Sequence, residues 1–98
     1  MPSDRPHLVQ EATGEHHLLR PRTTLGRSPD SDVVLADASC STHHAILRAD
    51  AEGWIVEDLG STNGTWVNGD WVQGTHPVRE GDLLQLGNLR FRARDMAW

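Results

Sequence analysis

The sequence predicts an all-β domain of the sandwich or barrel class. Turn-forming residues recur roughly every eight to twelve positions, which is the spacing of short strands in such folds. Most segments between the turns alternate apolar and polar residues, as strands with one buried face do. No segment of about ten or more residues has apolar positions at helical spacing, so we expect almost no helix. A chain of 98 residues forms one domain, residues 1–98, with a real hydrophobic core.

The expected strands follow one another along the chain. The clearest is 89–94, where apolar residues and arginines alternate with a period of two. The strongest hairpin signal is Asn68-Gly69, because this pair tolerates the positive φ angles of a type I′ turn. Residues 1–5 and 95–98 are expected to be frayed. The expected strands are 7–11, 16–20, 23–26, 33–35, 44–49, 54–59, 65–67, 70–72, 76–79, 83–87 and 89–94.

Composition excludes several classes of protein. No apolar run approaches the ~20 residues that span a bilayer, and the N-terminal residues have no apolar stretch of signal-peptide type. The single cysteine, Cys40, cannot form an internal disulfide and favours a reducing cytoplasm. A net charge of −5 argues against general nucleic-acid binding. Any anion site must therefore be local and made by a few residues. All nine basic residues are arginine, which is a better fork-shaped ligand for phosphate than lysine.

Three loops carry more polar residues than turns require. Gly26-Arg27 precedes an acidic, proline-containing loop. The second polar segment is Ser41-Thr42-His43-His44, which leads into the expected strand 44–49. The third is Gly60 to Thr65, a polar cluster around Asn63-Gly64. In this order and spacing, the segments resemble the forkhead-associated (FHA) domain, whose pattern is Gly-Arg, Ser-x-x-His and Asn-Gly. The resemblance covers about residues 25–91.

The resemblance implies an FHA-type sandwich of two antiparallel sheets with about eleven strands. It also implies that loops at one end bind a phosphothreonine peptide, which is the FHA mode of recognition. The partners implied are phosphothreonine-containing proteins, such as a Ser/Thr protein kinase or its substrates. No cofactor, nucleic acid or membrane is implied, and the chain could be a whole protein or an excised domain. The peptide sequence preferred and the oligomeric state are not readable from the sequence.

Each matching residue has a chemical role in this scheme. Arg27 offers a planar fork of donors that stays charged. Ser41 and Thr62 add short hydroxyl donors, and the amide of Asn63 suits the main chain of the peptide. The residues expected to support the site without touching the ligand are Gly26, His44 and Gly64.

One position departs from the family. The residue after the family serine is commonly an arginine that makes a second positive contact, whereas this chain has Thr42. Thr42 is still expected to be one of the phosphopeptide-binding residues. His43 could replace that contact, because Ser41 and His43 point to the same side of an extended segment. Protonated His43 would then tighten binding as the pH falls.

Other interpretations compete with this one. The same fold could act as a phosphate-independent scaffold that contacts proteins through its sheet faces. A hydrolase could be drawn from Ser41, His43 or His44, and Asp37 or Asp58. No nucleophile-elbow pattern supports it, so we expect no enzyme activity. Metal binding is disfavoured, because neighbouring histidines in a strand point to opposite faces. Trp54, Trp66 and Trp71 are expected to be core or half-buried residues, and Arg90, Arg92 and Arg94 a solvated sheet face.

Overall fold

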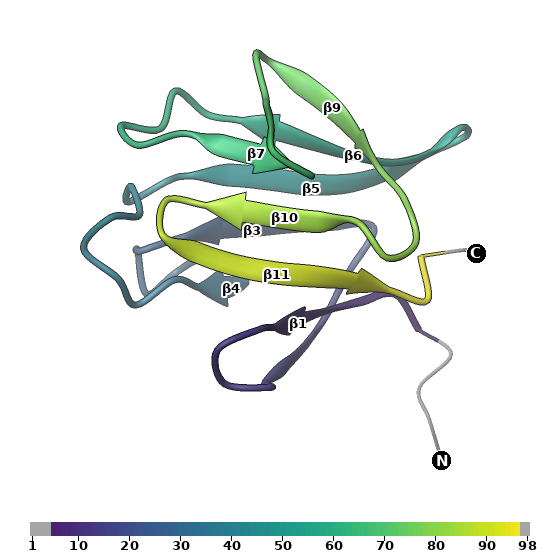
Figure 1. The fold of residues 1–98 in the computed structure, drawn as a ribbon, viewed down its shortest axis with the longest axis horizontal. Helices are drawn as coiled ribbons and strands as arrows, with labels where there is room; N and C mark the ends of the chain where they lie inside the picture. Colours follow the sequence, from purple (N-terminus) through teal and green to yellow (C-terminus); the bar gives the residue numbers. More distant parts are fainter. Residues whose placement is uncertain (1–4, 97–98) are drawn as a thin grey trace.

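The structure is a computed structural model that describes residues 5–96, which form two packed β-sheets (Figure 1). The six-stranded sheet has the order β2-β1-β11-β10-β7-β8, and the five-stranded sheet has the order β4-β3-β5-β6-β9. The strands are β1 His7–Gln10, β2 His16–Leu18, β3 Arg22–Gly26, β4 Val33–Val34, β5 Ala45–Asp50, β6 Gly53–Asp58, β7 Thr65–Val67, β8 Asp70–Trp71, β9 Thr75–Val78, β10 Leu83–Leu86 and β11 Leu89–Arg94.

The predicted fold class is confirmed, with eleven strands in two sheets. All pairs are antiparallel except β3 with the two-residue strand β4. The β7–β8 hairpin turns at Asn68 and Gly69, whose φ angles of 51° and 85° are those that a type I′ turn needs. Residues 5–96 contain no helix, and therefore none long and apolar enough to cross a membrane.

The core lies between the sheets and is built by the inward-facing residues of both. Phe91 and Ala93 of β11 are almost wholly buried, as their alternation with arginines predicts. Trp54 is buried with 3% of its surface exposed, and Trp66 is half-buried. Trp71 differs from the expectation, because 60% of its surface is exposed while its neighbour Val72 is 2% exposed and fills the inner position.

The C-terminal part also differs from the expectation of fraying. Met96 is buried against the core, and its backbone N–H donates a hydrogen bond to Glu80 Oε1 at 3.0 Å. A buried side chain and a satisfied amide hold this residue in place. Within the expected frayed segments, residues 1–4 and 97–98 lie outside the described residues.

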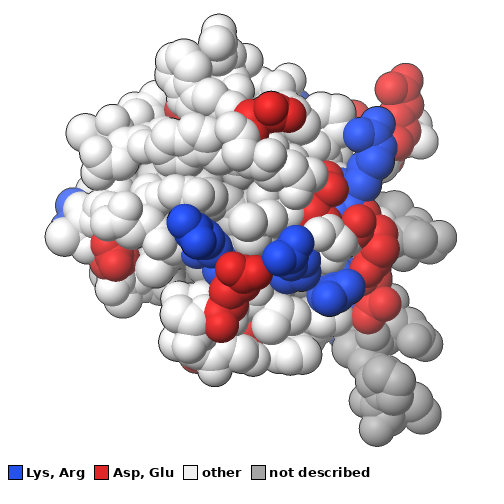
Figure 2. Space-filling model, in the orientation of Figure 1, with Lys and Arg blue, Asp and Glu red and all other residues white. Residues whose placement is uncertain are grey.

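The arginine side of β11 is a surface of mixed charge. Figure 2 shows basic and acidic side chains next to one another over this strand. Arg92 Nη2 lies 2.8 Å from Glu11 Oε2, and Arg94 Nη1 lies 3.9 Å from Glu80 Oε2. Exposed pairs of this kind add little stability, so the row behaves as the solvated sheet face that was expected.

Strand direction brings distant loops together at one end of the sandwich. β3 ends, β5 begins and β6 ends at the same edge, because Leu25 pairs with Ala45 and Ala45 with Asp58. Figure 1 shows the connections β3–β4, β4–β5 and β6–β7 gathered on the left, whereas β1 begins and β11 ends on the right. The three predicted polar segments therefore share one end of the molecule.

Candidate functional site

The candidate site is formed by three loops, residues 27–32, 35–44 and 59–64, which we call the loop end. These segments follow β3, precede β5 and follow β6 respectively. Because the strands are hydrogen-bonded neighbours, their ends fix the bases of the loops. Hydrogen bonds between the loops then set where each polar side chain lies.

Arg27 is held beside the second loop by its backbone and its side chain. Its backbone N–H donates to Ser41 O at 2.9 Å, and its Nε donates to Cys40 O at 3.0 Å. The Nε contact aims the guanidinium but leaves both terminal nitrogens without a partner among residues 5–96. The side chain is exposed, so these donors face solvent at the loop end.

Gly26 allows the first two loops to approach closely. A Cβ at this position would overlap the carbonyl oxygen of Thr42. That carbonyl instead accepts the backbone N–H of Ser28 at 3.1 Å, and the carbonyl of Ser41 accepts that of Arg27. Gly26 therefore serves close packing of backbones, which is one of the reasons a glycine is required.

His44 joins the second and third loops from inside. Its Nδ1 accepts the backbone N–H of Ser41 at 3.1 Å, which leaves the proton on Nε2 to be donated to Gly64 O at 2.9 Å. The side chain is fully buried, with 0% exposed. Because both contacts are to backbone, the ring fixes the spacing of the two loops and does not reach the surface.

Ser41 and Asn63 extend the same connection to the surface. Ser41 Oγ accepts the backbone N–H of Thr62 at 2.9 Å, which leaves its hydroxyl hydrogen free of partners among the described residues. Asn63 Nδ2 donates to Ser39 O at 2.8 Å. Its Oδ1 and second N–H hydrogen make no contact within residues 5–96. Thr62 and Asn63 are both exposed.

Gly64 ends the third loop with a backbone conformation that side chains rarely adopt. Its φ is +93°, and a Cβ there would lie 2.8 Å from the indole of Trp66. Only glycine satisfies both conditions without strain. The carbonyl that His44 binds is thereby placed under the loop.

Asp58 organises the third loop and was not identified from the sequence. Its two carboxylate oxygens accept four hydrogen bonds: from the hydroxyls of Ser61 and Thr65 and from the backbone N–H groups of Gly60 and Ser61. Burial acts to raise the pKa of Asp58, but these bonds outweigh it and hold the pKa below its usual range. The sequence signal for this role is an aspartate followed within a few residues by glycine and serine, because an aspartate side chain commonly bonds to the backbone two residues further on, in an Asx turn.

A fourth segment also reaches the loop end. Ser39 Oγ accepts the backbone N–H of Asn88, in the β10–β11 turn, at 2.8 Å. A Cβ on Gly87 would lie 2.6 Å from the same hydroxyl oxygen, so the turn packs directly on Ser39. Neither contact was expected from the sequence, because Ser39 and Asn88 are 49 residues apart.

The structure thus brings most predicted site residues together. Arg27, Ser41, Thr62 and Asn63 lie on loops joined by hydrogen bonds, and Thr42 lies between Ser41 and His43 with its carbonyl in the same network. His43 is exposed and lines a neighbouring pocket. Cys40 beneath them is buried, and burial raises the pKa of its thiol, which donates to Leu86 O at 3.4 Å. The arrangement places an arginine with free terminal nitrogens and several short polar side chains on loops at the same end of the molecule.

Comparison with known proteins places the same segments in a family. The family model described as FHA domain matches residues 23–87. A curated relative, the glycogen accumulation regulator GarA of Mycolicibacterium smegmatis, is 41% identical over 78 residues, covering 79% of this chain and 49% of that protein. The chain spans about half the length of the curated relatives it matches.

Solved structures agree with the family match. Mycobacterium tuberculosis EmbR in complex with a low-affinity phosphopeptide has a TM-score of 0.89 and 28% identity, covering 95% of this chain and 25% of that one. A structure described as part of an analysis of phosphothreonine-dependent FHA domain interactions has a TM-score of 0.83 and 31% identity. It covers 91% of this chain and 94% of the other.

Proposed function

Because this chain belongs to the FHA domain family, we propose that its loop end binds phosphothreonine peptides and so mediates phosphorylation-dependent protein–protein interaction. The similarity to EmbR, whose structure holds a phosphopeptide, supports this proposal. The observation that carries it is the guanidinium of Arg27, whose Nε donates to the carbonyl of Cys40, the residue before Ser41, and whose terminal nitrogens have no partner among residues 5–96. The wider partners would be Ser/Thr kinases or their substrates.

The chemistry of a phosphothreonine suits these groups. The ester carries about −1.5 to −2 charges and strong acceptor oxygens. Arg27 can give two parallel N–H donors to that phosphate, and the hydroxyls of Ser41 and Thr62 can add uncharged donors. Hydrogen bonds to charged groups contribute roughly 1.5–3 kcal/mol each. Three or four such bonds, less the cost of association, give a dissociation constant of about 1 μM.

Asn63 suits the peptide backbone next to the phosphate. Its contact with Ser39 O uses one of two N–H hydrogens and orients the amide. The remaining N–H and the carbonyl oxygen can pair with one peptide unit, because an amide donates and accepts at once. The two Asn-Gly steps therefore have different roles. The side chain of Asn68 bonds within the protein, to Asp82 Oδ1 and to the N–H of Leu83, whereas Asn63 turns the chain and binds the peptide.

This proposal describes a binding module without catalytic activity. Ser41 Oγ accepts a backbone N–H and has no hydrogen bond to a histidine, since the ring nitrogens of His44 bond to the Ser41 amide and the Gly64 carbonyl. A serine nucleophile needs a base within hydrogen-bond reach of its hydroxyl. GarA is by its name a regulator, and other relatives are by their names inhibitors, which fits a binding module.

Titration with three matched peptides tests the proposal. The peptides carry threonine, phosphothreonine or phosphoserine at one position and are otherwise identical, and binding is followed by calorimetry. We expect heat of binding with the phosphothreonine peptide and little with the other two. Equal binding of all three would favour the second candidate, a phosphate-independent scaffold that contacts partners through its sheet faces.

His43 supplies a second, narrower test at the same site. It follows Thr42, which stands where the family commonly has an arginine, and its exposed ring can approach a bound phosphate. We propose that protonated His43 adds a positive contact, so that binding tightens as the pH falls. Phosphate itself gains a proton near pH ~6, so the pH profile of His43→Gln must be measured in parallel. Identical profiles would remove His43 from the site.

A further inference from the structure

The two Asn-Gly steps of the chain, Asn63-Gly64 and Asn68-Gly69, are chemically reactive as well as turn-forming. In such a step the backbone nitrogen of the glycine can attack the side-chain amide carbon of the asparagine, because glycine has no Cβ to hinder the approach. The attack releases ammonia, and asparagine is accordingly one of the thermolabile residues. Reaction in a folded protein depends on how firmly the amide and the attacking nitrogen are held.

The amide of Asn68 is held at both ends. Its Nδ2 donates to Asp82 Oδ1 at 2.9 Å, and its Oδ1 accepts the backbone N–H of Leu83 at 2.9 Å. Both bonds must break before the amide carbon can turn toward Gly69. No side chain in the described part of the protein accepts the N–H of Gly69. The fold therefore protects this step.

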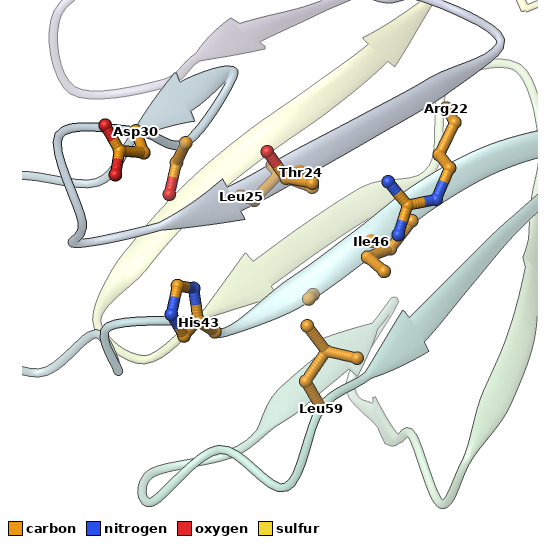
Figure 3. A pocket seen from close by; sticks show the side chains of 9 residues that line it. Arg22, Thr24, Leu25, Asp30, His43, Ile46 and Leu59 are labelled. Atoms are coloured by element: carbon orange, nitrogen blue, oxygen red, sulfur yellow. The ribbon is translucent and has the colours of Figure 1, made fainter.

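Asn63 is held less firmly. Its Nδ2 donates to Ser39 O at 2.8 Å, whereas its Oδ1 and second N–H hydrogen have no partner within residues 5–96. The side chain is exposed. Figure 3 shows Leu59, the first residue of the same loop, across an open pocket of about 250 Å³ from Ile46. Solvent therefore borders this loop at its base as well as at its tip, and the loss of one hydrogen bond frees the amide to turn.

The attacking nitrogen of this step is connected to a carboxylate. The N–H of Gly64 donates to Ser61 Oγ at 3.0 Å, and Ser61 Oγ donates to Asp58 Oδ1 at 2.6 Å. A backbone nitrogen must lose its proton as it attacks a carbonyl carbon, and a base within hydrogen-bond reach assists that loss. A carbonyl acceptor would only hold the N–H, whereas a hydroxyl that itself donates can pass the proton on. The lowered pKa of Asp58 keeps its carboxylate ionised at neutral pH.

We propose that Asn63-Gly64 is a site of self-deamidation, in which Ser61 passes the proton of the attacking Gly64 nitrogen to Asp58. The bond that forms joins Gly64 N to Asn63 Cγ, and the bond that breaks is Cγ–Nδ2. The departing nitrogen takes up the transferred proton and leaves as ammonia, which restores the Asp58 carboxylate. Water then opens the succinimide to aspartate or isoaspartate, so one water is consumed for each ammonia released.

The modification changes the loop end where the proposed function needs it unchanged. A carboxylate at position 63 loses the N–H that donates to Ser39 O, and it adds a negative charge at the end of the molecule that carries Arg27. Isoaspartate also adds one carbon atom to the main chain directly before Gly64, whose carbonyl His44 holds. Phosphopeptide binding should therefore be lost with the amide, a consequence that rests on the proposed function.

Mass spectrometry of the unaltered chain tests the site itself. The protein is kept folded at mildly alkaline pH, sampled over time and digested, and the converted fraction of each asparagine is measured. We expect Asn63 to react about fivefold faster than Asn68, because one hydrogen bond fewer has to break. The same experiment in urea should bring the two rates together, since the protection of Asn68 depends on the fold. Equal rates in the folded protein, or a faster reaction at Asn68, would overturn the proposal.

Two variants test the proton path. Ser61→Ala removes the hydroxyl between Gly64 N and Asp58, and Ser61→Thr keeps one. We expect Asn63 to react more slowly in folded Ser61→Ala and at a restored rate in Ser61→Thr, with no difference between the variants in urea. A purely structural hydrogen bond has the opposite effect, because its removal loosens the loop. Faster or unchanged deamidation of Asn63 in Ser61→Ala would therefore refute the role of Ser61.

A phosphothreonine peptide separates this inference from the proposed function. If both hold, affinity falls in step with deamidation of Asn63, and a saturating peptide slows the reaction at Asn63 but not at Asn68. Deamidation of Asn63 in a folded protein that binds no phosphothreonine peptide would end the proposed function and leave the modification site standing. Peptide binding that persists after Asn63 is fully converted would overturn the stated consequence for binding.

Discussion

His44 Nε2 lies 2.9 Å from the carbonyl oxygen of Gly64, a residue 20 positions further along the chain. The other ring nitrogen accepts the backbone N–H of Ser41, so one buried imidazole connects the two loops that carry Ser41 and Asn63. Both contacts are to main-chain groups. Without the ring the N–H of Ser41 would lose its partner, whereas Gly64 O would keep the N–H of Gly87 at 3.1 Å. Loop position at this end of the domain therefore depends on a residue that a bound peptide cannot reach.

Replacement of this histidine should affect stability and binding together. His44→Phe keeps the volume of the ring but leaves the Ser41 N–H without a partner and removes one of the two hydrogen bonds to Gly64 O, which costs about 1–3 kcal/mol in free energy of unfolding. Urea denaturation measures this loss. His43→Phe, at the exposed neighbouring position, should change the free energy of unfolding by less than about 0.5 kcal/mol. Equal stability of the two variants would mean that the His44 hydrogen bonds contribute nothing.

Arg27→Ala should have the opposite pattern, with a loss of binding and a preserved fold. The side chain is exposed, and its contact within the protein is one hydrogen bond from Nε to Cys40 O. We expect phosphothreonine peptide binding to weaken by more than about tenfold, the equivalent of one charged hydrogen bond or more. Calorimetry measures the affinity, and Arg90→Ala on the other sheet is the matched control. Unchanged affinity would exclude Arg27 from the site.

The strands and the family were predictable because each depends on local pattern. The alternation of apolar and polar residues predicted which side chains of 89–94 face the core. The Asn68-Gly69 pair predicted a turn, and the structure confirms its positive φ angles. The resemblance to the FHA domain is confirmed by the family match over residues 23–87. Trp71 was misplaced because strand alternation does not say which of two adjacent apolar residues faces inward, and Val72 does.

The supporting contacts of the site were not predictable, because they join residues far apart in the chain. Ser39 pairs with Asn63 and with the Asn88 turn, at separations of 24 and 49 residues. Nothing in the local sequence of a serine indicates such partners. The role of Asp58 was missed for another reason, since an aspartate two residues before a glycine, as in Asp58-Leu59-Gly60, is equally typical of an ordinary turn.

Gly26 gives a steric prediction that does not depend on ligand binding. Gly26→Ala places a Cβ against the carbonyl oxygen of Thr42, and backbone cannot move aside as a flexible side chain can. The control is Gly69→Ala, where φ is +85° but no heavy atom lies within 4 Å of the added Cβ. The control should lose about 1 kcal/mol from its positive φ alone, and Gly26→Ala should lose more. Thermal unfolding of both variants measures the two losses of stability, and equal losses would contradict the steric argument.

Asp58 links the acid stability of the domain to its third loop. Its pKa is lowered in the folded protein, against the effect of burial, by hydrogen bonds from Ser61, Thr65 and Gly60. A group whose folded pKa is depressed stabilises the fold at pH values above its unfolded pKa. That stabilisation is lost as the pH falls through the lowered folded value, where the carboxylate becomes protonated.

Asp58→Asn should therefore cost stability in a pH-dependent way. Near pH 7 we expect a loss of about 1–3 kcal/mol in free energy of unfolding, because charged hydrogen bonds are replaced by neutral ones. The difference from the unaltered protein should shrink below about pH 4, where Asp58 begins to lose its charge in the unfolded state and then in the folded state. Urea denaturation at several pH values measures it, with the exposed Asp70→Asn on β8 as the control. A difference that stays constant down to pH ~2 would show that the charge of Asp58 does not stabilise the loop.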